Sequence, residues 1–465
     1  MRQFQSLIQA CLISAVVFAV VAKTSALADQ PAPEKKQPKS VEKKPADEKD
    51  DAGDKKDKKK KKEQKKDRYF AVTGATVHTV SRGDLYGATV LVKNGRFAEI
   101  GRGVAIPKDA ETLDASGYHI YPGLVAVRGG NVIGSDPADE TTDVYSLWMT
   151  IALAGGITTA VSGDTAVSLT YGSVEDMVVG RDLFVSLKYS SNDPENRRKV
   201  REGFDKVRQY MRDVQAYQEK KKINPDAEEP DKEWIKGDYE KYYKLLKRET
   251  IAKVTANSAH EINEYCSLAE RYGIRLVIDK ALEGWTVARR MARAGVSAIV
   301  SIRPPIFSSD TGEDERLNRP TGRSIENAAI LHKYGVPIAI IPSTASITSW
   351  GLAGRDLLHL NMEAAFAVRG GLPQDAALRS ITIEPARILG IDDRVGSLEV
   401  GKDGNFMITD GDPLHYMTQV RWTVVGGRVV YDKQKESLFS HIRPNGDRNA
   451  PPPDDYWPRR LGDEQ

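Results

Sequence analysis

Side chains that could bind a metal or act as nucleophiles are scarce in this chain of 465 residues. A catalytic dication such as zinc needs several histidines, cysteines or carboxylates that converge around one open coordination position. Only His260 lies just after a strand of the predicted strand–helix region, and one histidine without carboxylate partners does not make a metal site. Neither the serine motif Gly-x-Ser-x-Gly nor the complete phosphate-binding motif Gly-x-x-x-x-Gly-Lys-Ser/Thr occurs. The histidines are His78, His119, His260, His332, His359, His415 and His441.

The elements that position these residues begin with a β-rich segment at each end. From Tyr69 onward β-branched residues alternate with polar ones, and Asn94-Gly95 is typical of a hairpin turn. Residues 395–431 have the same character. Because the two segments flank a different kind of sequence, we predict one small β-sandwich formed by residues 68–121 and 391–435 together.

Short apolar runs alternate with helical patterns between these two segments. Strand-like runs at 251–256, 275–279 and 298–302 are each followed by an amphipathic helical pattern. Repeated strand–helix units predict a parallel sheet with helical crossovers, and their number favours a closed barrel. The predicted fold class is therefore α/β, with a (β/α)8 TIM-like barrel over residues 122–390 and the small β-sandwich beside it.

A charged insertion at residues 193–250 interrupts this rhythm. Residues 196–221 form a strongly helical pattern, in which apolar residues recur every three or four positions. Such a pattern predicts an amphipathic helix lying on the barrel, and a partner-binding helix is the alternative. Residues 223–232 are predicted to be a polar loop.

Several stretches resemble the amidohydrolase superfamily. Pro122-Gly123-Leu124-Val125 resembles the turn that enters its barrel and leads into a His-x-His pair. Residues 380–390, 396–403 and 410–414 resemble its closing helix and its return into the β-sandwich. The resemblance spans about residues 69–435 and is nearest to the imidazolonepropionase-like branch. It implies a barrel with one or two divalent metals at the C-terminal mouth, where metal-bound water attacks an amide carbon.

The residues at the implied ligand positions depart from the superfamily's set. Arg128 and Gly130 stand where the first two histidines are implied. Asn257 and Lys280 stand near the positions of the histidines after strands 5 and 6, and Lys188 matches the bridging lysine. The implied aspartate after strand 8 falls near Ser343 or Thr344.

Arg128, Lys188 and Lys280 would place three cations where the superfamily has metal ions. Like charges at close range are costly unless anions join them. Asp279 and Glu283 would supply those anions in a structural ion cluster, whereas an open pocket would take a small anionic ligand such as a carboxylate or phosphate. The candidate pocket residues are Arg128, Lys188, Asn257 and Lys280, the catalytic residues are unknown, and no metal or other cofactor is expected unless the protein is an active enzyme using zinc or another dication.

Residues 1–28 have the features of a secretory signal peptide. Arg2 is followed by an apolar run from Leu7 to Ala22, and Ala26-Leu27-Ala28 is a cleavage site. The run is shorter than the roughly 20 residues of a membrane-spanning helix, and an uncleaved anchor is the alternative. We expect an exported protein of the periplasm or cell envelope. Cleavage leaves Cys266 as the remaining cysteine, which we predict is a packed core residue.

Residues 29–67 contain fifteen lysines and eleven acidic residues with almost no apolar side chains. Such a composition predicts a disordered linker, and residues 436–465 are a C-terminal tail. The lysines at 58–62 could contact an anionic envelope surface, whereas a soluble spacer is the plainer interpretation. The formal net charge is only +3, so no nucleic-acid partner is expected.

Three functions fit these observations. The first is a catalytically inactive, exported amidohydrolase-like protein that acts in binding or as a scaffold. The second is an active hydrolase of amide or cyclic amide C–N bonds with a rearranged site. The third is an envelope-associated protein whose Lys-rich arm and charged insertion contact a partner. Function depends on the site rather than on the fold, so the site must decide among them.

Overall fold

The computed structural model describes residues 67–135, 137–189, 192–303, 322–347 and 355–436. The predicted signal peptide, nearly all of the Lys-rich linker and nearly all of the C-terminal tail lie outside these ranges. Within them, no helix is both long enough and apolar enough to span a membrane.

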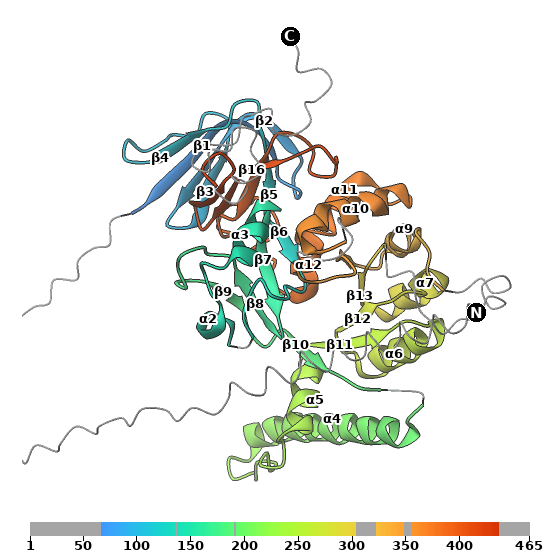
Figure 1. Cartoon of the computed structure of the whole chain (residues 1–465). Helices are drawn as coiled ribbons and strands as arrows, with labels where there is room; N and C mark the ends of the chain where they lie inside the picture. Colours follow the sequence, from blue (N-terminus) through green and yellow to red (C-terminus); the bar gives the residue numbers. More distant parts are fainter. Residues whose placement is uncertain (1–66, 136, 190–191, 304–321, 348–354, 437–465) are drawn as a thin grey trace, which may run out of the picture. The chain divides into compact units, whose positions relative to one another are not determined.

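One mixed sheet joins strands from the two ends of the described chain (Figure 1). Its strands are β1 Tyr69–His78, β2 Asp84–Lys93, β3 Arg96–Gly101, β4 Glu111–Asp114, β5 His119–Pro122, β15 Phe406–Thr409, β16 Val420–Val425 and β17 Arg428–Asp432. The order is β17-β16-β15-β5-β1-β2-β3, and β4 pairs with β1. Phe97, Ile120 and Phe406 are buried in its apolar core. The sheet therefore unites both predicted segments, while the two-layered sandwich remains a prediction.

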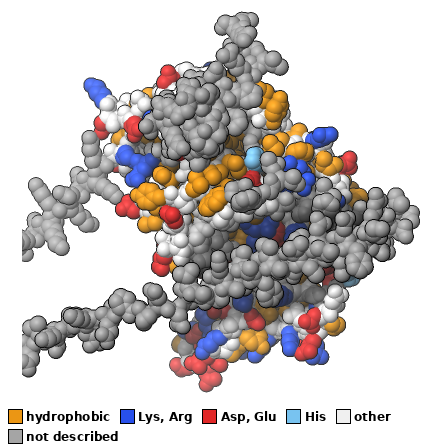
Figure 2. Space-filling view, in the orientation of Figure 1, with side chains coloured by type: hydrophobic (Ala, Val, Ile, Leu, Met, Phe, Trp, Pro, Cys, Tyr) orange, Lys and Arg blue, Asp and Glu red, His pale blue; other side chains and the backbone are white. Residues whose placement is uncertain are grey.

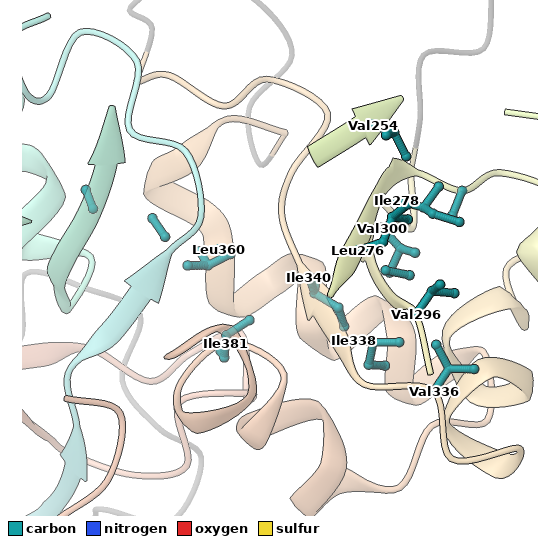
Figure 3. Close-up of a cluster of buried hydrophobic side chains, with 14 of the residues drawn as sticks. Val254, Leu276, Ile278, Val296, Val300, Val336, Ile338, Ile340, Leu360 and Ile381 are labelled. Carbon is teal, nitrogen blue, oxygen red and sulfur yellow. The ribbon is translucent and has the colours of Figure 1, made fainter. Parts of the chain in front are cut away.

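A second, fully parallel sheet has the order β10-β11-β12-β13-β14. Helices α6, α7 and α9 follow β11, β12 and β13 along the chain, as the alternating pattern predicts. Figure 3 shows Val254, Ile278 and Val300, which belong to the cluster that packs beneath these helices. The bounds are β10 Phe184–Ser186, β11 Ile251–Ala256, β12 Leu276–Lys280, β13 Ser297–Val300, β14 Ile338–Ile340, α6 Ala259–Tyr272, α7 Gly284–Ala294 and α9 Asn327–Lys333.

A third sheet, β6-β7-β8-β9, begins at the Pro122-Gly123 turn. Its strands are β6 Leu124–Ala126, β7 Ile157–Ser162, β8 Thr165–Ser168 and β9 Val178–Gly180. A Cβ atom at Gly123 would lie only 2.0 Å from Thr158 Oγ1, so only glycine lets the chain enter here. The antiparallel strands β8 and β9 were absent from the sequence prediction, because strands of four and three residues give no clear alternation.

Backbone hydrogen bonds link the second and third sheets at two edges. Ser380 and Ile381 connect β14 to β6, because Ile340 donates to the Ser380 carbonyl at 3.0 Å and Val125 donates to the Ile381 carbonyl at 2.9 Å. At the other edge Leu183 donates to the Asp164 carbonyl at 2.9 Å. The strands assigned in the described residues remain two sheets, so this region is a mixed α/β fold and the closed barrel stays a prediction.

The remaining helices connect or follow the strands of these sheets along the chain. Their bounds are α2 Ala138–Thr141, α3 Leu147–Ala154, η2 Leu357–His359, α10 Leu360–Arg369, α11 Gln374–Arg379 and α12 Ile383–Leu389. Thr423 of the first sheet donates from Oγ1 to the Leu153 carbonyl of α3 at 2.6 Å. The terminal sheet is thus bonded directly to the β/α region.

The charged insertion forms two packed helices, α4 Pro194–Ile223 and α5 Asp238–Leu246. Phe204 of α4 lies 4.5 Å from Tyr242 of α5 and 4.6 Å from Tyr272 of α6 between ring centroids. The predicted amphipathic helix therefore packs on the β/α region, whereas α5 was not predicted. In Figure 2 acidic and basic side chains are interspersed in the lower part of the view, where Figure 1 places these helices.

Candidate functional site

Side chains alternate between the two faces of the parallel sheet, and two ionisable side chains lie on the face opposite the helices. Alternate residues of β11 and β12, such as Val254 and Ile278, pack in the cluster beneath the helices (Figure 3). Residues next to them in sequence face the other way, because successive side chains of a strand point to opposite faces. Lys253 and Asp279 occupy such positions, on the face that also carries Val277 of a second apolar cluster.

Arg128 and Asp279 form the central ion pair of this face. Arg128 follows β6, and its Nη2 donates to Asp279 Oδ1 at 3.2 Å. The Asp279 side chain is 7% exposed and that of Arg128 33%, so the pair is largely withdrawn from water. Arg128 Nε is buried without a hydrogen-bond partner among the described residues. The guanidinium therefore keeps an unused donor for an additional acceptor.

A cavity of about 590 Å³ opens beside this pair. It combines apolar walls with hydroxyl and charged groups, which is typical of small-ligand pockets. Its lining residues come from β7, β10, β11 and the segments that follow β6 and β7. They are Val127, Arg128, Val161, Gly163, Asp164, Phe184, Ser186, Lys253 and Thr255.

Lys253 is the second cation of the cavity, and the sequence analysis did not select it. Its Nζ lies 4.9 Å from the centre of the Phe184 ring, within range of a cation–π contact. Burial lowers the pKa of Lys253, the nearby Asp279 opposes that effect, and the positive charge of Arg128 adds to it. A lysine in the middle of a β-branched strand, two positions before Thr255, was the signal that could have identified it.

The other three candidate pocket residues lie outside the lining of this cavity. Lys188, Asn257 and Lys280 are all exposed. Lys280 has a positive φ of 77°, because the chain turns sharply at the end of β12. Within the part of the chain that the structure describes, neither Lys188 nor Lys280 forms an ion pair. Arg128 is thus the candidate that the structure brings into the cavity.

Glu283 has a different role from the one considered in the sequence analysis. One carboxylate oxygen accepts from the Ala259 backbone amide at 2.7 Å, and the other accepts from the Gly322 amide at 2.7 Å. Both oxygens therefore fix backbone segments, and the carboxylate joins no ion pair in the described chain. The expected cluster of three cations and two carboxylates contains one pair, Arg128–Asp279.

The described residues at the implied ligand positions do not fit a dication. Protonated Arg128 and Lys280 offer no lone pair, and Asp279 already accepts from Arg128. A side chain at Gly130 would start 3.1 Å from the Ser346 Cβ, so the adjacent segment would have to shift to admit a histidine there. No three His, Cys, Asp or Glu side chains converge as metal ligands in the ranges that the structure describes.

His260 and Cys266, both on α6, lie outside the cavity lining. His260 is 71% exposed and lies 3.8 Å from Glu264 on the same helix, on the outer side of α6. Cys266 is fully buried, and burial raises the pKa of its thiol to about 12. The prediction that Cys266 is a packed core residue is confirmed.

A second cavity of about 590 Å³ lies against the terminal sheet, and two of its arginines bind protein groups. Arg394 pairs with Asp403 at 2.8 Å and donates to the Val178 carbonyl at 2.8 Å. Arg68 donates to the Gly426 carbonyl at 2.6 Å. Arg394 Nε, like Arg128 Nε, is buried without a partner among the described residues, but only the cavity beside Arg128 also contains a lysine withdrawn from water, Lys253.

Comparisons with known proteins give amidohydrolases as relatives. A family model described as "Amidohydrolase family" matches residues 273–431. The chain is 33% identical over 99 residues to the amidohydrolase tasK of Hapsidospora irregularis, a match covering 20% of this chain and 10% of that protein. It is 34% identical over 122 residues to the imidazolonepropionase of Cupriavidus taiwanensis, covering 25% and 24%. The matches thus span a tenth to about a quarter of these relatives' lengths.

The fold agrees with these partial matches. A crystal structure of an amidohydrolase from Thermotoga maritima MSB8 superposes with a TM-score of 0.56 and 23% sequence identity. That superposition covers 78% of this chain and all of the other. The sequence motifs, the family model and the superposition point to the same group of proteins. These partial matches relate the chain to the amidohydrolase superfamily.

Proposed function

We propose that this protein is an exported amidohydrolase-like pseudoenzyme that binds a small anionic ligand in the cavity at Arg128 and Lys253. Metal-dependent hydrolysis is lost in this proposal, because cationic and amide side chains stand at the implied ligand positions. The scaffold is a (β/α)8 barrel with a β-sandwich. The backbone bonds of Ser380 and Ile381 between β14 and β6 support that closure.

The unpaired cation in the cavity carries this proposal. Arg128, Lys253 and the carboxylate of Asp164 line the cavity, and Asp279, the acidic group that acts on Lys253, is already paired with Arg128. Lys253 makes no hydrogen bond or ion pair within the described chain, and its recorded contact is with the Phe184 ring. A cation withdrawn from water without a counter-ion is costly, so an incoming carboxylate or phosphate would be stabilised here.

Calorimetric titration with phosphate, acetate and succinate tests the ligand class. Arg128→Gln and Lys253→Met should each weaken binding by about tenfold or more, since each removes one charge-assisted contact. Lys188→Met and Lys280→Met are matched controls, because both lysines are exposed and lie outside the cavity lining. Anion binding that is unchanged in Arg128→Gln and Lys253→Met would contradict the proposal.

An active hydrolase of C–N bonds with a rearranged site is the second candidate. The match of residues 273–431 to an amidohydrolase family model favours it. Elemental analysis of residues 29–465 after incubation with zinc and manganese separates the two candidates. Less than about a tenth of an equivalent of bound metal per chain would support the pseudoenzyme, because a functional metal site binds its ion tightly enough to be nearly filled. About one equivalent, together with turnover of amide or cyclic amide substrates, would make the hydrolase the better account.

Export and the role of the Lys-rich arm rest on sequence alone. The apolar run before Ala26-Leu27-Ala28 supports cleavage and release to the periplasm or cell envelope. N-terminal sequencing of the protein from its native host should begin at Asp29, whereas an intact N-terminus would indicate an anchor. Pull-down with and without residues 29–67 tests contact of the arm with an envelope partner.

A further inference from the structure

Lys253 has the surroundings of a reactive amine rather than of a structural cation. It lies in the middle of β11 and lines the cavity together with Ser186 and Thr255. Its Nζ packs near the face of Phe184 and has no hydrogen-bond or ion-pair partner among the described residues. A structural lysine withdrawn from water would be expected to meet a carboxylate, so this amine is left available to a ligand.

The same surroundings favour the uncharged form of the amine. Burial is the main cause that lowers the pKa of Lys253, and the charge of Arg128 adds to it against the effect of Asp279. A lysine nitrogen is nucleophilic only when it has lost its proton, and desolvated lysines in proteins form imines with carbonyl compounds. Lys188 and Lys280 are exposed and lack this environment.

We propose that Lys253 forms an imine with a small aldehyde acid or keto acid whose carboxylate is held by Arg128. This inference rests on the proposed anion-binding cavity and deepens it by naming the ligand class. Arg128 suits the role because its buried Nε has no partner while Nη2 is held by Asp279. The fixed Asp279 pair orients the guanidinium, and a planar guanidinium binds a carboxylate with defined geometry.

The reaction needs no oxidant and no metal. The lone pair of the Lys253 nitrogen attacks the carbonyl carbon, and the C–N bond forms as the carbonyl π bond breaks. The oxygen takes a proton from solvent and the nitrogen loses one, giving a carbinolamine. A second proton converts the hydroxyl into water, which leaves with the C–O bond while the nitrogen lone pair completes the C=N bond. The products are a protonated imine and one water molecule.

Reductive trapping tests this inference. The full mature chain is incubated with limiting glyoxylate and cyanoborohydride, and the labelled lysines are identified by peptide mass mapping. Lys253 should be labelled about tenfold more than Lys188 or Lys280, although those two are more accessible to reagent. Arg128→Gln should lower labelling at Lys253 by about tenfold and leave Lys280 unchanged. Labelling of Lys253 at or below the level of the two exposed lysines would overturn the proposal.

Titration of the wild-type chain with acetate and succinate separates this inference from the proposed function, because these anions bind without forming an imine. Lys253→Arg keeps a cation in the cavity but has no primary amine, so labelling at residue 253 should be lost. Anion binding without labelling of wild-type Lys253 would refute the imine and leave the binding function intact. Labelling by propionaldehyde as efficient as labelling by glyoxylate would refute the role of Arg128 as the carboxylate partner. Circular dichroism of each variant confirms that the variants are folded.

Discussion

At the scale of single residues, the Arg128–Asp279 pair links the cavity to the stability of the fold. Arg128→Met should lower the free energy of unfolding by about 2 kcal/mol, because it leaves the carboxylate of Asp279 withdrawn from water without its partner. Replacing both residues, as Arg128→Met with Asp279→Leu, should recover much of that loss. Urea unfolding of both single variants and the double variant measures the coupling.

An exposed ion pair provides the control for this cycle. Arg198 and Glu202 lie 3.7 Å apart on α4 with side chains 67% and 68% exposed. Their coupling should be about 0.5 kcal/mol or less, since solvent and salt screen it. Equal coupling energies for the two pairs would mean that the Arg128–Asp279 pair is no more withdrawn from water than a surface pair.

The pH dependence of stability should report the environment of Lys253. Its pKa in the folded protein lies below the ordinary value of 10.5, so the unfolded chain binds more protons between the two values. Stability contributed by this residue therefore rises with pH across that window. Relative to Lys253→Met, the wild type should gain stability as pH increases toward 10.5, as measured by urea unfolding. A difference that stays constant with pH would show that the folded state leaves this pKa unchanged.

At the scale of elements, close packing fixes the helices of the insertion. A Cβ atom at Gly203 of α4 would lie 2.4 Å from Cε2 of Tyr242 on α5. Gly203→Ala should therefore cost about 1–3 kcal/mol, although alanine is the better helix former. Urea unfolding and tryptic cleavage within α4 measure the effect. Glu202→Ala, one residue away and exposed, should change stability by less than about 0.5 kcal/mol.

A second substitution identifies the cause of that effect. Tyr242→Leu removes the ring that the new methyl group would meet, so Gly203→Ala should be much less harmful in that background. An equal loss in both backgrounds would mean that the steric contact between α4 and α5 is not the reason.

At the scale of the whole molecule, the terminal sheet and the β/α region should unfold together. Phe406 is fully buried on β15, and its neighbour Met407 belongs to the core cluster of the β/α region. Phe406→Ala should cost about 3–5 kcal/mol and speed hydrogen exchange in β12 as well as in β1. Val400→Ala is the control, since Val400 is 65% exposed. Faster exchange confined to the terminal sheet would show that the two regions unfold separately.

The local sequence determined many of the helices and strands, because the patterns that predict them span only a few neighbouring residues. The run Ile251–Ala256 is a β-branched strand as predicted, and α6 follows after a Ser258 capping box that fixes its start. The amphipathic spacing of α4 likewise predicted the helix and its buried face. By contrast β8 and β9 were missed because they are too short to show an alternation, and α5 was missed because packing against α4 stabilises it.

The tertiary structure alone decided which charged groups meet. The ligand positions implied by the superfamily resemblance selected Lys188, Asn257 and Lys280, yet these side chains are exposed, whereas Lys253 lies deeper along its strand and lines the cavity. The Arg128–Asp279 contact joins residues 151 positions apart, and nothing local encodes it. Short-range signals in the sequence therefore determined most of the elements, and its motifs determined the resemblance to the superfamily. Strand register and sheet packing, which depend on the whole chain, decided the composition of the site.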